Sequence, residues 1–137
     1  MTSEQEHADK HEIAEVLDRY ATGIDRRDWA LFRTCFTDDV LAEYDGIATW
    51  RGGDAITESM TTSHAGMGHT MHQLSNLAIT VDGDTATARS YVDAVLMAAD
   101  GQSGLNPRGF YDDELVRTPE GWRIAHRHFT MVHFGTI

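Results

Sequence analysis

The chain has 137 residues, of which 41% are hydrophobic and 9% aromatic, a composition typical of one globular domain with a sizeable core. Its formal net charge of −11 argues against a nucleic-acid or anionic-membrane surface, because both bind lysine and arginine. A single cysteine, Cys35, excludes an internal disulfide and indicates a reducing compartment. Because Cys35 lies in an apolar helical run, we interpret it as a buried structural thiol.

The first residues, 1–8, are polar and acidic, unlike a signal peptide, and no apolar run is long enough to cross a bilayer. We expect them to be a frayed lead-in to a cytoplasmic protein that forms one domain, residues 1–137.

The N-terminal half predicts helices with two short strands between them. Apolar residues recur at helical spacing over about 9–22, and Gly23 ends that helix. Asp28 is placed to cap a second helix, which the run 37–39 ends. A first strand over 40–45 and a short strand through Trp50 follow. Residues 52–54 then open a third helix, about 55–63.

The C-terminal half predicts long strands. The first spans 70–81 and is closed by Asp82-Gly83-Asp84, a strong hairpin signal. The others span 85–98, 110–117 and 122–134, with a loop over 102–107. Helices first and an antiparallel meander afterwards predict an α+β domain whose helices pack on one face of the sheet.

The alternation in the strand over 70–81 is interrupted. His72 and Leu74 share one face, whereas Leu77, Ile79 and Val81 share the other. A β-bulge near Ser75-Asn76 would bring both sets inward and turn His72 toward a cavity. A strand buried on both faces is the alternative.

The stretch 19–29 places two polar side chains, Tyr20 and Asp25, among apolar residues that should face the core. An unpaired buried carboxylate is costly, and His72 is its most suitable partner. A neutral histidine is a useful base near pH 7, a carboxylate on its other nitrogen fixes the tautomer, and a tyrosine hydroxyl can donate to a substrate oxygen. Alternatively, Asp25 caps the second helix and His72 is an ordinary core histidine.

Several motifs together resemble the SnoaL-like branch of the nuclear transport factor 2 superfamily. They are Arg19-Tyr20, Ile24-Asp25, Arg27-Asp28-Trp29, Phe36-Thr37-Asp38-Asp39, Trp50-Arg51-Gly52 with Asp54-Ala55-Ile56, the Asp82-Gly83-Asp84 turn, and Gly121-Trp122-Arg123-Ile124. The resemblance implies a cone-shaped α+β fold, in which a curved antiparallel sheet wraps around the N-terminal helices and encloses a pocket. This fold hosts several chemistries, so it does not by itself name a function.

The resemblance also implies roles for particular residues. In three lyases of the superfamily (scytalone dehydratase, bile-acid 7α-dehydratase and hexachlorocyclohexane dehydrochlorinase) an aspartate at the end of the first helix orients a histidine on the long strand, which abstracts a proton. Asp25 and His72 match these positions, and Tyr20 and Tyr44 match tyrosines of the dehydratases. This chain departs from them at other positions. Phe110 or a neighbour replaces a second catalytic histidine, and Ala94 and Met131 replace an aspartate and an arginine, so neither dehydratase reaction is transferred.

Two other readings concern polar residues on the strands. The runs His69-Thr70-Met71-His72 and His126-Arg127-His128 invite a metal reading, since residues two apart on a strand share one face, and His133 or Asp25 could add a third metal ligand. The superfamily enzymes named above need no metal, and we predict none. Arg89 and Asp93 resemble part of an epoxide-hydrolase set, but the opposite strand face is more apolar, which predicts that both point outward, at a subunit interface.

We therefore predict a cofactor-independent acid/base enzyme, a dehydratase, isomerase or cyclase, acting on a hydrophobic oxygenated ring compound such as a steroid- or polyketide-like molecule. His72 is the predicted base, Asp25 its orienting partner and Tyr20 a hydrogen-bond donor. The competing hypothesis is a non-catalytic binding or dimerisation module. We also expect a homo-oligomer, either dimer or trimer. The predicted pocket lining is Tyr44, Trp29, Phe32, Trp50, Met60, Leu74, Phe110 and Met131.

Overall fold

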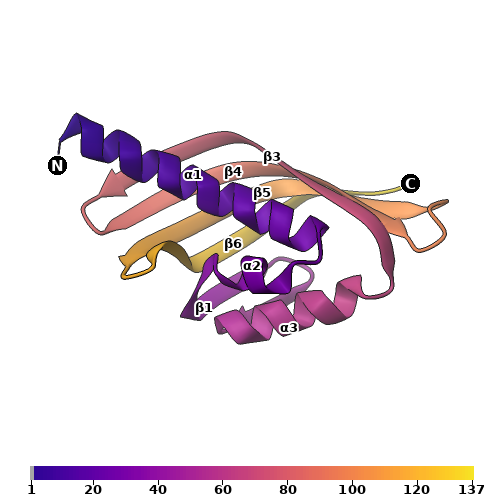
Figure 1. The fold of residues 1–137 in the computed structure, drawn as a ribbon. Coiled ribbons are helices and arrows are strands. Elements are labelled where there is room, and N and C mark those ends of the chain that lie inside the picture. Colours follow the sequence, from indigo (N-terminus) through magenta and orange to yellow (C-terminus); the bar gives the residue numbers. More distant parts are fainter. Residues whose placement is uncertain (1) are drawn as a thin grey trace.

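The structure is a computed structural model that describes residues 2–137. Within them lie the helices α1 (Ser3–Asp25), α2 (Trp29–Arg33) and α3 (Gly53–His64). The strands are β1 (Phe36–Tyr44), β2 (Ala48–Arg51), β3 (Met67–Asp82), β4 (Thr85–Ala98), β5 (Gly104–Thr118) and β6 (Gly121–Thr136). They form a curved sheet in the order β2-β1-β6-β5-β4-β3, with α1 across one face and α2 and α3 beside β1 (Figure 1). The predicted α+β fold is confirmed.

Helix α1 begins at Ser3, so the expectation of a frayed lead-in was wrong for Ser3–Ala8, while Met1 lies outside the described residues. The hydroxyl of Thr2 caps the helix by accepting from the backbone N–H of Gln5 at 3.1 Å. Further along, the buried carboxylate of Asp9 binds the guanidinium of Arg117 at 2.9 Å. The cap and this ion pair hold the first turns in place.

Strand β1 begins at Phe36, earlier than the predicted start at Val40. Phe36 pairs with Ile124 of β6, and Ile124 donates its backbone N–H to the carbonyl of Cys35 at 2.8 Å. The pairing of β1 with β6 is parallel, which corrects the expectation of a wholly antiparallel sheet. Because this long-range pairing cannot be seen in the local sequence pattern, α2 is shorter than predicted, at five residues, and β1 begins earlier.

Strand β3 contains the predicted bulge. Its pairing with β4 shifts register between Ser75 and Ala78, and Asn76 has φ 54°, in the left-handed region. As a result His72 and Ile79, on opposite sides of the bulge, both turn toward the helices, whereas Leu77 is exposed.

Strands β3 and β5 are longer than predicted, because residues outside the predicted strands pair with the end of β4. Met67 lies opposite Ala98, and Leu105 lies opposite Leu96. These extensions carry the sheet past the helices. They add strand surface around one end of the domain, where the cavity lies.

The core lies between α1 and the inner face of the sheet. On β4 this face carries the small side chains Ala86, Ala88, Val92 and Ala94, all buried. Arg89 points to the other face, where it binds Asp112 at 2.7 Å, as the alternation predicted. No helix within residues 2–137 has the length and hydropathy that crossing a bilayer would require.

Candidate active site

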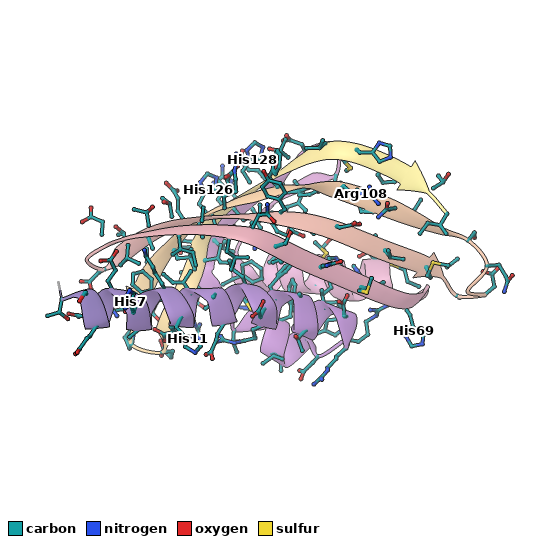
Figure 2. The ribbon with its side chains drawn as sticks, turned by 90° about the horizontal axis from the view of Figure 1, so that it is seen from above. His7, His11, His69, Arg108, His126 and His128 are labelled. Atoms are coloured by element: carbon teal, nitrogen blue, oxygen red, sulfur yellow. The ribbon has the colours of Figure 1, made fainter. Side chains whose placement is uncertain are left out.

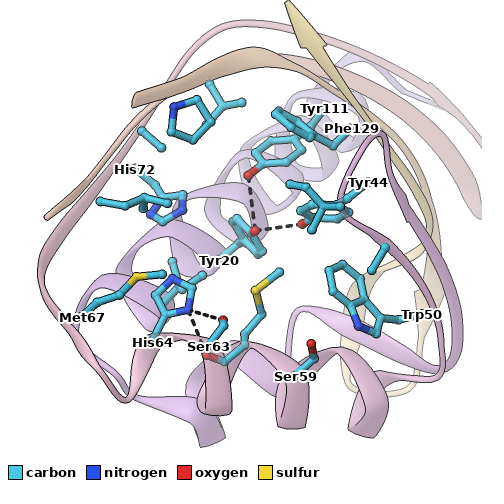
Figure 3. Close-up of a pocket in the computed structure, with 18 residues that line it drawn as sticks. Tyr20, Tyr44, Trp50, Ser59, Ser63, His64, Met67, His72, Tyr111 and Phe129 are labelled. Carbon is cyan, nitrogen blue, oxygen red and sulfur yellow. Dashed lines mark hydrogen bonds between the residues drawn. The ribbon is translucent and has the colours of Figure 1, made fainter. Parts of the chain in front are cut away.

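A cavity of about 370 Å³ opens between the helices and the inner face of the sheet. Every helix and strand except α2 contributes to its wall, which is mostly apolar. Figure 3 shows two imidazole rings, His64 and His72, on one side, and Trp50 and Tyr44 on the other. A volume of this size suits a small organic molecule.

The carboxylate of Asp25 contacts the imidazole of His72 beside this cavity. The distance from Nδ1 of His72 to Oδ1 of Asp25 is 2.7 Å. The backbone N–H of His72 donates to Oδ2 at 2.8 Å, and the hydroxyl of Thr70 donates to Oδ1 at 2.9 Å. Asp25 is therefore bound by strand β3 through three hydrogen bonds and cannot rotate away from the histidine.

These hydrogen bonds also keep Asp25 ionised. Burial raises the pKa of Asp25, but hydrogen bonds from the side chain and backbone of His72, with a further one from Thr70, outweigh it, so that this pKa lies below the usual aspartate value. Arg27, which has φ 58°, donates to Thr70 Oγ1 at 2.8 Å and to the carbonyl of Gly68 at 2.7 Å. Arg27 thus holds Thr70 in place, and Thr70 in turn donates to the carboxylate of Asp25.

The carboxylate fixes the tautomer of His72. An ionised carboxylate only accepts hydrogen bonds, so Nδ1 carries the proton and Nε2 keeps its lone pair. The side chain of His72 is 8% exposed and lines the cavity. The alternative in which Asp25 caps the second helix is wrong, because the side chain of Asp28 does so, accepting from the backbone N–H of Leu31 at 3.1 Å.

Three tyrosine hydroxyls meet at the cavity. The hydroxyl oxygen of Tyr20 lies 2.8 Å from the hydroxyl oxygen of Tyr44 and 3.3 Å from that of Tyr111. Burial raises the pKa of all three above the ordinary tyrosine value, so they stay protonated at neutral pH. Their two mutual hydrogen bonds use two of three protons, which leaves one to donate to a bound molecule.

A fully buried ion pair lies behind these tyrosines. Arg127 donates to both carboxylate oxygens of Asp113, at 2.7 and 2.9 Å, and its Nη1 donates to Tyr44 at 3.4 Å. Its guanidinium carbon lies 4.2 Å from the ring centre of Tyr20 and 3.8 Å from that of Tyr111. The cation fixes both rings and, by donating to Tyr44, turns that hydroxyl's own proton outward, toward Tyr20 or the cavity.

The structure divides the predicted pocket residues into three groups. Tyr44, Trp50 and Met60 line the cavity. The second group belongs to the hydrophobic core or packs against it, and does not line the cavity. Its members are Trp29, Phe32, Leu74 and Met131. The third is Phe110, which lies on the outer face beside Tyr91, with ring centres 4.9 Å apart. Its neighbour Tyr111 points inward, because adjacent strand residues face opposite sides.

Sequence reasoning missed four polar groups near or in the site: His64, Tyr111, Arg127 and Asp113. His126-Arg127-His128 predicted that the two histidines share a face, and the structure places both on the outer face (Figure 2). There His126 contacts Glu43 and Glu114, and His128 contacts Asp45. Across residues 2–137, no three His, Cys, Asp or Glu side chains are grouped so that they could hold a metal ion.

The buried thiol agrees with its predicted structural role. Cys35 is fully buried, and its Sγ lies 3.6 Å from the carbonyl of Val16. Burial raises its pKa to about 12. A thiol held in this form is a poor nucleophile.

Comparison with known proteins places the chain in a family. Residues 5–128 match the SnoaL-like domain family, so the chain is a SnoaL-like protein. An uncharacterised protein of Mycobacterium tuberculosis (strain ATCC 25618 / H37Rv) is 33% identical over 129 residues, which are 93% of this chain and 88% of that protein.

Two solved structures are similar in fold. One, from Novosphingobium aromaticivorans, is provisionally assigned as a scytalone dehydratase. It has a TM-score of 0.90, is 19% identical, and the match covers 98% of this chain and 91% of that one. The other, a hexachlorocyclohexane dehydrochlorinase, has a TM-score of 0.89 and 19% identity, with coverage of 99% and 93%. At this identity the likeness shows the fold, and the activity is argued from this chain's own residues.

Proposed function

We propose that this protein is a cofactor-independent general acid/base enzyme of the lyase or isomerase type, acting on a hydrophobic, oxygenated ring compound. The observation that carries the proposal is the 2.7 Å contact between Asp25 and His72, with the imidazole opening into an apolar cavity. Lyase names among the similar structures agree with this reading but do not supply the residues.

In the proposed reaction, Nε2 of His72 removes a proton from a carbon next to a substrate carbonyl. The electron pair of the broken C–H bond moves toward the carbonyl oxygen, and Asp25 stabilises the imidazolium that forms. If the next carbon carries a hydroxyl, the electron pair returns to break its C–O bond, and the hydroxyl leaves as water with the proton that the His72 imidazolium gives back. If it carries none, the proton returns to another carbon and the substrate is isomerised.

The tyrosine cluster supplies the hydrogen bond for the developing negative charge. Tyr20 is the shared member of the cluster, and its neighbours Tyr44 and Tyr111 are protonated. A donor that is already oriented and buried stabilises an enolate oxygen more strongly than water does. The competing function, a binding module without turnover, would use the same cavity and would need no free Nε2 on His72.

The test uses 3-hydroxy-1-tetralone, a ring ketone that loses water to give fluorescent 1-naphthol. We expect the purified protein to accelerate this elimination, and Asp25→Asn to reduce kcat/KM by roughly 10²–10⁴, because the base loses its orienting charge. Asp112→Asn, which removes an aspartate from the outer face, is the matched control and should react at the wild-type rate.

Equal rates for Asp25→Asn and the wild-type protein would overturn the acid/base proposal. Binding of the tetralone with no elimination by the wild-type protein would favour the binding module instead.

A further inference from the structure

A second histidine, His64, lines the cavity, and one of its ring nitrogens is buried without a hydrogen-bond partner among the described residues. It is the last residue of α3 and is 5% exposed. Its Nδ1 lies 2.9 Å from the carbonyl oxygen of Met60 and 3.0 Å from Oγ of Ser63. Its Nε2 is buried and has no hydrogen-bond partner among the described residues. A buried polar atom without a partner is costly, and such atoms concentrate where a ligand supplies the partner.

The contact with Met60 decides which nitrogen carries the proton. A carbonyl oxygen can only accept, so at 2.9 Å it requires the proton of His64 on Nδ1. The Nε2 atom then presents a lone pair and is an acceptor. Burial lowers the pKa of His64, which keeps the ring neutral and Nε2 free to accept.

His64 and His72 therefore line one cavity in the same tautomer, with different partners on Nδ1. Their ring centres are 6.4 Å apart, on the same side of the cavity in Figure 3. The partner of His72 is an ionised carboxylate, which stabilises a protonated ring. The partner of His64 is a neutral carbonyl, which does not, so His64 is suited to accept a hydrogen bond and not to take a proton.

We propose that Nε2 of His64 accepts a hydrogen bond from a hydroxyl group of the ligand, and so makes the cavity selective for hydroxylated ring compounds over the corresponding ethers. The inference deepens the proposed function, on which it rests for the use of this cavity. An ether oxygen in the same place has no proton to give, so it would leave Nε2 unpaired. A ligand hydroxyl on His64 would also hold the ring beside Nε2 of His72.

The test measures the dissociation constants of 2-naphthol and 2-methoxynaphthalene by calorimetry, with no turnover involved. The wild-type protein should bind the naphthol about tenfold more tightly, the ratio expected for one buried hydrogen bond. In His64→Phe, which keeps the ring that packs against Trp29, this ratio should fall to about one while the ether's own affinity is kept. Thr61→Ala, which removes a hydroxyl from the exposed side of α3 outside the cavity lining, should keep the wild-type ratio.

A second measurement reads the tautomer directly. In protein labelled with ¹⁵N-histidine, the His64 signals should show the proton on Nδ1, and the Nε2 signal should move when 2-naphthol is added. The same preference for the naphthol in His64→Phe, its loss in His72→Phe, equal affinities in the wild-type protein, or a proton on Nε2 would each overturn the inference. None of these depends on catalysis. Asp25→Asn should retain the ratio even where elimination is lost, so the two proposals can fail separately.

Discussion

Two neighbouring aspartates of strand β5, Asp112 and Asp113, form ion pairs of the same geometry on opposite faces of the sheet, with Arg89 of β4 and Arg127 of β6. On the outer face Arg89 binds both oxygens of Asp112, at 2.7 and 2.9 Å, and on the inner face Arg127 binds both oxygens of Asp113 at the same distances. The outer side chains are 48% and 41% exposed, whereas the inner ones are fully buried. The two ion pairs therefore have the same hydrogen-bond distances and differ in their exposure to solvent.

The difference in surroundings gives the two pairs different roles. Water screens the outer pair, which contributes little to stability. The inner pair has no water to replace a lost partner, so each ion depends on the other. Only the inner cation lies against the tyrosines of the cavity, and it holds their rings and hydroxyls in place.

The histidines repeat this contrast. On the outer face His126 has carboxylates on both nitrogens, Glu43 at 2.6 Å and Glu114 at 3.0 Å, an arrangement that favours a charged ring. At the cavity His72 has a carboxylate on one nitrogen only. A histidine whose second nitrogen is free can take a proton from a ligand, whereas both ring nitrogens of His126 are bound to carboxylates.

The largest expected effect comes from breaking the buried pair. Asp113→Asn should lower the free energy of unfolding by about 3–5 kcal/mol, because it leaves Arg127 as an uncompensated buried charge. Asp112→Asn, one residue away, should cost no more than about 1 kcal/mol. Urea denaturation of both variants measures the difference. Similar losses would mean that burial does not distinguish the two faces.

The second prediction tests the tyrosines on the two faces. Tyr20→Phe should lower kcat for the elimination assay by about 10²-fold, the effect of removing one pre-oriented donor to a developing oxyanion. Tyr91→Phe, on the exposed outer face, is the control and should be as active as the wild-type protein. Steady-state kinetics decide this. A change in KM alone for Tyr20→Phe would assign the hydroxyl to binding and not to the transition state.

The third prediction concerns Arg117, which binds one buried and one exposed carboxylate. The side chain of Asp9 is 6% exposed and that of Asp84 is 84% exposed. Asp9→Asn should cost about 1.5–3 kcal/mol, because Asp9 also accepts from the indole N–H of Trp122 at 3.2 Å, while Asp84→Asn should have little effect.

The stability that Asp9 contributes to the fold should also depend on pH. The hydrogen bond with Arg117 lowers the pKa of Asp9 below its ordinary value of 3.8. A carboxyl with a lowered pKa stabilises the fold above its unfolded pKa, and that stability is lost as the pH falls through the folded pKa. Unfolding measured between about pH 5 and pH 2 should therefore show a smaller loss in Asp9→Asn than in the wild-type protein. Equal acid sensitivity would contradict the assignment.

The smallest effect is expected at His126. The hydrogen bond to Glu43, assisted by Glu114, raises the pKa of His126 above its ordinary value of 6.5. Its stabilising contribution is then complete below pH 6.5 and is lost as the pH rises through the raised value. It should stay under about 1 kcal/mol, since the group is partly exposed. An NMR titration should show a lower pKa for His126 in Glu43→Gln. An unchanged pKa would show that the contact does not persist in solution.

Local patterns were sufficient for much of the fold and for part of the site. The helical stripe predicted α1, the Asp82-Gly83-Asp84 turn predicted the hairpin, and the broken alternation predicted the bulge that turns His72 inward. The Asp25–His72 contact was named because a carboxylate among apolar residues requires a partner. These features follow from spacing and burial cost, which a single sequence contains.

Only the tertiary structure decided the rest of the site. On β6 the register with β5 slips between Glu114 and Leu115, so the inward set changes from Trp122 and Ile124 to Arg127 and Phe129. A slip of one residue moves every following side chain to the other face, and nothing local marked it. His64 lines the cavity because α3 packs beside β1. Tyr111 lines it in place of the predicted Phe110, because the strand register turns Tyr111 inward and Phe110 outward. The sequence thus determined which groups need partners, whereas register and packing determined which partners they meet.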